Sequence, residues 1–266
     1  MPAVRPAAVA GSFYPGDPAA LAAEVAAYLA ESPVEGRPVP KAIIAPHAGY
    51  IYSGAIAASV YARCRALAGR IRRVVLAGPA HRVYVRGAAV PDAEAFDSPL
   101  GRVMLDREAI ERLHALRFVE VSGPAHALEH SLEVQLPFLQ SVLGEFSLVP
   151  IVVGDASAEE MAQVFDLLWG AGETLIVVSS DLSHYHAYDL ARRTDRGTAQ
   201  RILDLDAALE PEEACGAAPI NGLLVVARRR GLSPELVDLR NSGDTAGDRQ
   251  RVVGYGAFAF HEAAHG

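Results

Sequence analysis

The stretch from which the architecture can be worked out is Lys41-Ala42-Ile43-Ile44-Ala45-Pro46-His47-Ala48-Gly49-Tyr50. Its short apolar run, rich in isoleucine, is typical of a buried β-strand. Pro46 has no N–H group to donate to a neighbouring strand, so the strand is predicted to end there. His47 is therefore expected at the carboxyl end of a buried strand.

Three further apolar runs end in a similar way, each followed closely by polar or metal-ligating side chains. They are residues 73–78 before His81, residues 174–179 before Asp181 and His184, and residues 236–240 before Asp244. In open α/β sheets, ligands bind just beyond the carboxyl ends of the strands. The sequence therefore predicts one shared pocket that collects side chains from several strand ends.

Length and composition indicate one domain. The chain has 266 residues, of which 51% are hydrophobic, and this is enough for one large core. Strand-like runs alternate with helical segments, and we find no internal repeat or linker between them. We predict a single α/β domain over residues 1–266, with a mixed, mostly parallel central sheet flanked by helices.

Charge and cysteine usage exclude several classes of protein. A net charge of −8 with scattered arginines argues against a nucleic-acid surface, which needs a concentrated basic footprint. No run approaches the ~18 uninterrupted apolar residues of a membrane helix, and the N-terminus lacks the apolar core of a signal peptide. Cys64 and Cys215 form no disulfide framework. We expect a cytoplasmic protein that binds neither nucleic acid nor membrane.

Common catalytic signatures are missing from the sequence. It contains no Gly-x-Ser-x-Gly elbow, no P-loop, no Gly-x-Gly-x-x-Gly after a strand and no His-Glu-x-x-His. Their absence removes the commonest hydrolase, nucleotide-hydrolysing, dinucleotide-binding and metalloprotease interpretations.

Two histidines are the first candidates for a metal site. His47 and His81 are 34 positions apart, so they can meet only at neighbouring strand ends. Neutral imidazoles on rigid strand ends suit iron, zinc or copper, and further ligands must complete such a site. Asp244 either makes local hydrogen bonds in a turn or completes a two-His, one-carboxylate iron(II) site. Cys215 is either a small buried side chain or a thiolate ligand.

The remaining polar candidates follow other predicted elements. His130 lies at the start of a helical pattern over residues 129–139, on which it shares a face with Glu133. It can serve as a third ligand, support a ligand or contact a substrate, or cap the start of the helix near a pocket. Asp181 and His184 either cap the following helix or act as an acid/base histidine oriented by a carboxylate, since imidazole titrates near ~6.5.

Several motifs, in one order along nearly the whole chain, resemble the Memo family. They are found at residues 5–15, 45–50, 78–81, 129–133, 179–184, 215–216 and 254–255. Prokaryotic members are called AmmeMemoRadiSam system protein B. The resemblance implies a fold similar to LigB-type, class III extradiol dioxygenases, whose non-haem iron is held by two histidines and one acid.

The resemblance also implies roles for individual residues. It places His47 and His81 at the metal, and His130 and His184 at the supporting and acid/base positions. Animal Memo proteins have a cysteine near the end of the chain as a third ligand, with copper or iron. The corresponding run here offers Asp244 or Thr245 instead, and a carboxylate favours a harder metal such as iron(II).

These observations lead to three hypotheses about function. The first is an iron(II) protein that performs oxygen-dependent redox chemistry on a small aromatic substrate, with His130, His184 and Asp181 as catalytic residues. The second is a non-catalytic module that binds a phosphopeptide, or the AMMECR-like and radical SAM partner proteins that the family name implies. The third is a zinc-dependent hydrolase. Copper and zinc are the alternative metals.

Overall fold

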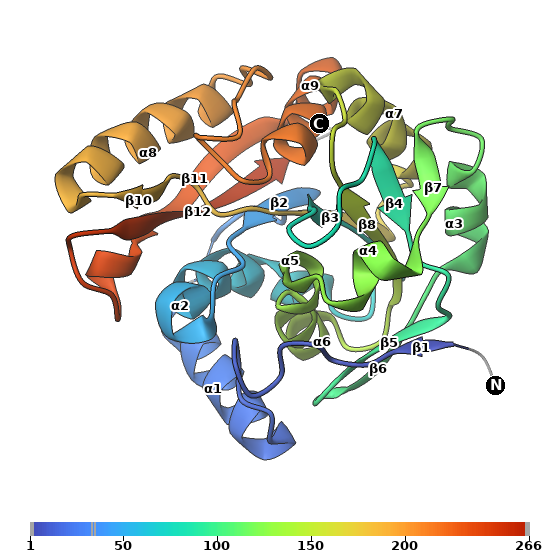
Figure 1. Ribbon diagram of the computed structural model, residues 1–266, viewed down its shortest axis with the longest axis horizontal. Helices are drawn as coiled ribbons and strands as arrows, with labels where there is room; N and C mark the ends of the chain where they lie inside the picture. Colours follow the sequence, from blue (N-terminus) through green and yellow to red (C-terminus); the bar gives the residue numbers. More distant parts are fainter. Residues whose placement is uncertain (1–2, 33, 35, 264–266) are drawn as a thin grey trace.

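The computed structural model describes residues 3–32, 34 and 36–263, and a mixed β-sheet runs through its centre (Figure 1). In sheet order, its strands are β10 (His184–His186), β12 (Val252–His261), β2 (Ala42–Ala45), β9 (Thr174–Ser179), β3 (Arg73–Pro79), β8 (Ser147–Val153), β4 (Ala88–Val90) and β7 (Val119–Val121). A further strand, β11 (Ser233–Asn241), pairs with β12. The central strands β2, β9, β3 and β8 are parallel, whereas β12 and β4 pair antiparallel with their neighbours β2 and β8. The predicted α/β domain with a mixed, mostly parallel sheet is confirmed.

Helices cover both faces of this sheet (Figure 1). One side carries α1 (Pro18–Ala30), α2 (Tyr50–Tyr61), η1 (Ala62–Leu67) and α6 (Leu136–Leu143), and the other carries α7 (Ala158–Leu168), α8 (Tyr188–Leu203) and α9 (Ala217–Arg230). The remaining short elements are α3 (Arg107–Leu113), α4 (Gly123–Ala127), α5 (His130–Glu133) and a three-stranded sheet of β1 (Val4–Arg5), β5 (Ala95–Ser98) and β6 (Gly101–Met104). Within the described residues, no helix is both long and apolar enough to cross a membrane.

The order of the central strands brings distant segments together. β9 lies between β2 and β3, so the segments that follow all three strands leave the same edge of the sheet side by side. β2 ends at Ala45, directly before Pro46, as the missing N–H group of proline predicts. β11 runs parallel to β2 but is separated from it by β12, so its end lies further along this edge.

The segment that begins with His130 is more broken than its sequence pattern predicts. α5 is a single turn that ends at Glu133, and α6 begins at Leu136 with Pro137 in its first turn. Proline is tolerated there because the first N–H groups of a helix have no partner within the helix. The continuous helix predicted over residues 129–139 is therefore divided into α5 and α6.

A buried ion pair ties the N-terminal segment to α5. The Arg5 guanidinium donates to Glu133 at 2.6 Å and to the Glu129 carbonyl oxygen at 2.7 Å. Glu133, which is fully buried, also accepts hydrogen bonds from the Ala8 N–H group and the Tyr14 hydroxyl group. Glu133 thus anchors the N-terminal segment to the turn that carries His130.

Candidate metal centre

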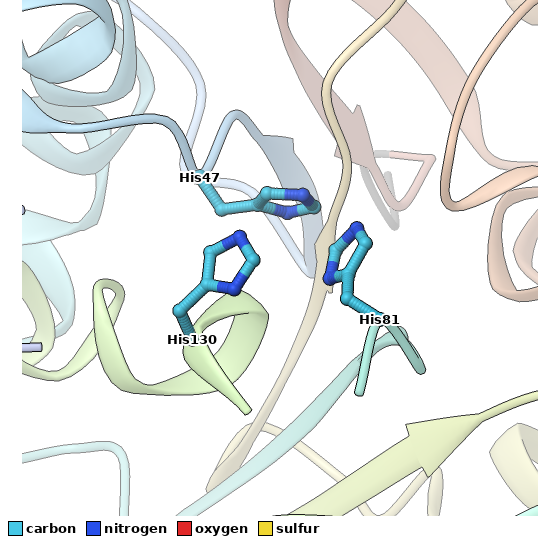
Figure 2. Close-up of side chains that lie close together, drawn as sticks. All are labelled: His47, His81 and His130. Carbon is cyan, nitrogen blue, oxygen red and sulfur yellow. The ribbon is translucent and has the colours of Figure 1, made fainter. Parts of the chain in front are cut away.

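Three imidazoles from three different elements converge at the carboxyl edge of the sheet. His47 follows β2, His81 follows β3, and His130 is the first residue of α5. Each offers a ring nitrogen, and these nitrogens all lie within 4.8 Å of one another. Figure 2 shows the three rings around one common space, with centroid distances of 5.2 Å for His47–His81 and 4.6 Å for His81–His130. Together, these three histidines are called the His cluster below.

The outer nitrogens of two of these rings are held by hydrogen bonds. His47 Nδ1 lies 2.9 Å from Ser179 Oγ, and His81 Nδ1 lies 2.9 Å from Glu129 Oε1. The Glu129 carboxylate also accepts the backbone N–H group of His81 at 2.6 Å. Such bonds orient imidazoles that bind metals. They direct the Nε2 atoms of His47 and His81 away from these partners, and His47 Nε2 lies 3.3 Å from Cys215 Sγ.

The protonation states also suit a metal. Burial and the neighbouring histidines lower the pKa of His47 to about 3 and that of His130 to about 4. Burial opposes the ionisation of Glu129, but hydrogen bonds from His81 and the Ser131 N–H group lower its pKa to about 2. At pH 7 the cluster therefore presents neutral His47 and His130 beside an ionised carboxylate, and neutral imidazole is the form that binds metals.

The His cluster fits a transition-metal ion. Two metal–nitrogen bonds of about 2.1 Å span at most about 4.2 Å, so the nitrogens need to move by less than about 1 Å. His130 Nδ1 is buried and has no hydrogen-bond partner among the described residues, although it lies 3.4 Å from Glu129 Oε1. In the described part of the chain, the His cluster is the group of three candidate ligands that meets this spacing. Imidazole donors suit iron, copper or zinc better than magnesium or calcium.

Asp244 does not join the His cluster. Its carboxylate accepts hydrogen bonds from the Tyr188 hydroxyl group and from the Asn241 N–H group, and it lines a different cavity. The reason is the strand order, because β12 separates β11 from β2 and so displaces the turn η2 (Ser242–Asp244) along the edge. The Thr245 hydroxyl group likewise bonds locally, to the Ser242 carbonyl oxygen. The structure thus gives this turn the local role that was the alternative to metal binding.

Asp181 and His184 lie beside the cluster rather than at a helix start. The Asp181 carboxylate accepts the backbone N–H group of His47 at 2.8 Å, and its Oδ2 lies 4.0 Å from His47 Nε2. Burial raises the pKa of Asp181. His184 begins β10, and α8 starts later, after Ala187, so Asp181 does not cap that helix. With His130, these two residues line a hollow of about 450 Å³.

The other walls of this hollow include four aromatic side chains. Phe13, Tyr52, Tyr185 and Tyr255 line it, and the Phe13 ring centroid lies 4.8 Å from that of His130. Tyr185 has a φ of 62°, a left-handed conformation that non-glycine residues rarely adopt and that is often found at functional sites. Its exposed ring lies under the Arg251 guanidinium, 5.0 Å from the centroid. The hollow can therefore accept a small flat molecule.

Two further residues contact the cluster: Glu129, which the sequence analysis did not single out as a site residue, and Cys215, for which a ligand role was one alternative. Glu129 bonds to His81, 48 positions away, and its place directly before His130 in the motif at residues 129–133 was the signal that could have drawn attention to it. Cys215 Sγ lies 3.3 Å from His47 Nε2 and accepts the Asp181 N–H group at 3.3 Å. Burial and the charge of Asp181 raise the pKa of Cys215 to about 12, so the thiol stays protonated unless a metal replaces the proton.

Comparisons with known proteins agree with the expected family. The profile described as Memo-like protein matches residues 5–259. A MEMO1 family protein of Aquifex aeolicus is 37% identical, with 95% of this chain and 97% of that protein covered. One from Methanosarcina barkeri is 35% identical, with 96% and 98% covered. The crystal structure of the uncharacterized protein JW3007 from Escherichia coli K12 covers 80% of this chain and 98% of its own, at a TM-score of 0.50 and 14% identity, and so resembles it in fold alone. The chain therefore belongs to the Memo-like protein family.

Proposed function

We propose that the His cluster binds one divalent transition-metal ion, with iron(II) as the first choice, for oxygen-dependent chemistry on a small aromatic molecule. The observation that carries this proposal is the convergence of three imidazoles beside a hollow that contains four aromatic side chains. The resemblance to LigB-type, class III extradiol dioxygenases, which use a non-haem iron, supports the same class of chemistry.

In this proposal, His47, His81 and His130 hold the ion. When bound, the ion supplies Lewis acidity and a redox-active centre. Tyr52 and Tyr185 contact the flat faces of the substrate. Asp181 and His184, which line the same hollow, hold or transfer the proton of a substrate hydroxyl group. Phe13, packed on the His130 ring, keeps water away from that side of the cluster.

The first experiment tests metal binding and then turnover. Protein purified without oxygen should contain about one equivalent of metal by elemental analysis, and His47→Ala and His81→Ala should each lose most of it. His114→Ala is the matched control, because His114 pairs with Glu111 on α3, outside the cluster. Oxygen consumption with catechol-like compounds then tests the chemistry. A metal-free wild-type protein with unchanged metal affinity in both variants would overturn the proposal, and metal-dependent hydrolysis without oxygen uptake would favour a zinc hydrolase.

Cys215 bears on which metal is bound. Three imidazoles without a carboxylate suit iron, copper and zinc, whereas a thiolate favours copper(I) or zinc. A protein loaded with cobalt(II) should show a sulfur-to-cobalt charge-transfer band only if Cys215 is a ligand, and Cys215→Ser should then remove the band. A spectrum without this band would leave the His cluster as the metal site and keep iron(II) as the first choice.

A second candidate function is favoured by the exposed apolar residues near the site. Ile51 and Tyr52 follow His47, Val83 and Tyr84 follow His81, and Leu128 and Tyr185 adjoin His130 and His184. Exposed apolar side chains that form a contiguous patch mark interaction surfaces. As the alternative, we propose a binding module for AMMECR-like or radical SAM partner proteins, or for a phosphopeptide. Calorimetry on the metal-free protein separates the two functions, because only the module should still bind these partners.

A further inference from the structure

A second cavity lies between α8 and the end of β11, outside the hollow beside the His cluster. It has a volume of about 290 Å³. Its polar lining consists of Tyr188, Arg192, Asp195 and Arg196 from α8, Arg240 and Asn241 from β11, and Asp244 from η2. We propose that this cavity binds a small oxyanion, with a phosphate group as the best fit. This site does not depend on the proposed metal chemistry and would remain if that chemistry were disproved.

The first argument is the lack of counter-ions for two arginines. Arg192 and Arg196 lie one turn apart on α8, and among the described residues neither has a carboxylate within 4.0 Å. Arg201 of the same helix, by contrast, pairs with both Asp206 and Glu213. Like charges four residues apart destabilise a helix. A bound anion would offset this repulsion, and guanidinium groups match the oxygens of phosphate in paired hydrogen bonds.

The second argument is that the polar groups around these arginines are already engaged. Asp244 also lines the cavity, but it accepts hydrogen bonds from the Tyr188 hydroxyl group and the Asn241 N–H group and pairs with neither arginine. Arg192 lies over the Tyr188 ring, 5.5 Å from its centroid. Arg240 pairs with Asp238 through Nε and Nη2 only, which leaves Nη1 for a ligand. The guanidinium groups of Arg192 and Arg196 and the Nη1 atom of Arg240 are therefore the donors that we assign to the anion.

The third argument is that the buried carboxyl group in the wall of the cavity does not pair with the arginines. Asp195 is 2% exposed, its Oδ1 accepts the Ser183 N–H group, and its carboxyl group packs against Gly254 of β12. The arginine side chains are therefore the charged groups of α8 that a ligand in the cavity can reach.

Calorimetric titration of the full chain with inorganic phosphate at low ionic strength tests the proposal. Wild-type protein should show saturable binding with a dissociation constant on the order of 1 mM or below. Arg196→Gln should weaken it by about tenfold or more, because it removes a hydrogen-bonded charge. Arg193→Gln is the matched control. It removes the same charge from α8, but Arg193 is not among the residues that line the cavity.

Three results would overturn the proposal. They are a wild-type titration without saturation, an unchanged affinity in Arg196→Gln, and an equal loss in Arg193→Gln, which would indicate diffuse surface charge. Arg192→Gln provides an independent second variant, and circular dichroism establishes that each variant is folded. Parallel titration with acetate distinguishes the ligand classes, because a phosphate site should bind phosphate at least tenfold more tightly.

Discussion

Replacing Glu129 by glutamine should weaken metal binding although Glu129 is not itself placed as a ligand. In the wild-type protein both carboxylate oxygens accept hydrogen bonds from His81, at 2.9 Å from Nδ1 and at 2.6 Å from the backbone N–H group. A third bond, of 2.9 Å, comes from the Ser131 N–H group. In Glu129→Gln one of these oxygens becomes an NH₂ group, which has no lone pair to offer. At least one N–H group of His81 or Ser131 then loses its acceptor.

The size of the effect follows from this loss. Removing a hydrogen-bond partner that orients a metal-binding histidine typically costs about 10–100-fold in metal affinity. This range corresponds to about 1.4–2.8 kcal/mol. It agrees with the value of about 1.5–3 kcal/mol for a hydrogen bond to a charged group. We therefore expect the dissociation constant for zinc or iron(II) to rise by about one to two orders of magnitude.

The assay is a competition titration against a chelator of known affinity at pH 7, with circular dichroism as a check on folding. Glu111→Gln is the matched control, because Glu111 also lies beside a histidine, His114, but on the surface of α3. Its metal affinity should stay within about twofold, as expected for a surface change of about 0.5 kcal/mol or less. A folded Glu129→Gln protein with wild-type metal affinity would refute the conclusion that Glu129 prepares His81 for a metal.

The remaining predictions concern stability. Glu133→Gln leaves the buried Arg5 side chain without its counter-charge. The free energy of unfolding in guanidinium chloride should therefore fall by about 3–5 kcal/mol, and an unchanged midpoint would contradict this. Gly222→Ala places a Cβ atom 2.3 Å from the side chain of Met161, where α9 packs on α7, and should destabilise the protein by about 1–3 kcal/mol. Gly197→Ala, with nothing within 4 Å, should instead stabilise α8 by up to about 1 kcal/mol, and the same sign for both glycine variants would be inconsistent with this packing. The pKa values of about 3 for His47 and about 4 for His130 lie below the ordinary 6.5, so on acidification the unfolded chain takes up protons first. These two histidines should therefore make the metal-free protein less stable as the pH falls from about 6.5 towards about 4. A urea concentration at the unfolding midpoint that increases as the pH falls through this range would count against it.

The local pattern of the sequence was enough to find the four apolar runs that became β2, β3, β9 and β11, but not the short strand β10. The apolar run before Pro46 predicts where β2 ends, because a missing N–H group is a property of one residue. The same reasoning predicts that His47 and His81 leave the sheet at one edge. The segment after His130 was less predictable, because only packing shows that Glu133 binds Arg5 rather than facing the site.

The choice of partners depends on strand order, which no local pattern contains. β9 between β2 and β3 brings His47 and His81 together, whereas β12 between β11 and β2 leaves Asp244 in another cavity. The contact of Cys215 with His47 spans 168 positions of the chain. Hydrophobic periodicity and proline act over a few residues and so can be read directly from the chain. Contacts between side chains at different strand ends arise only when the whole sheet is assembled.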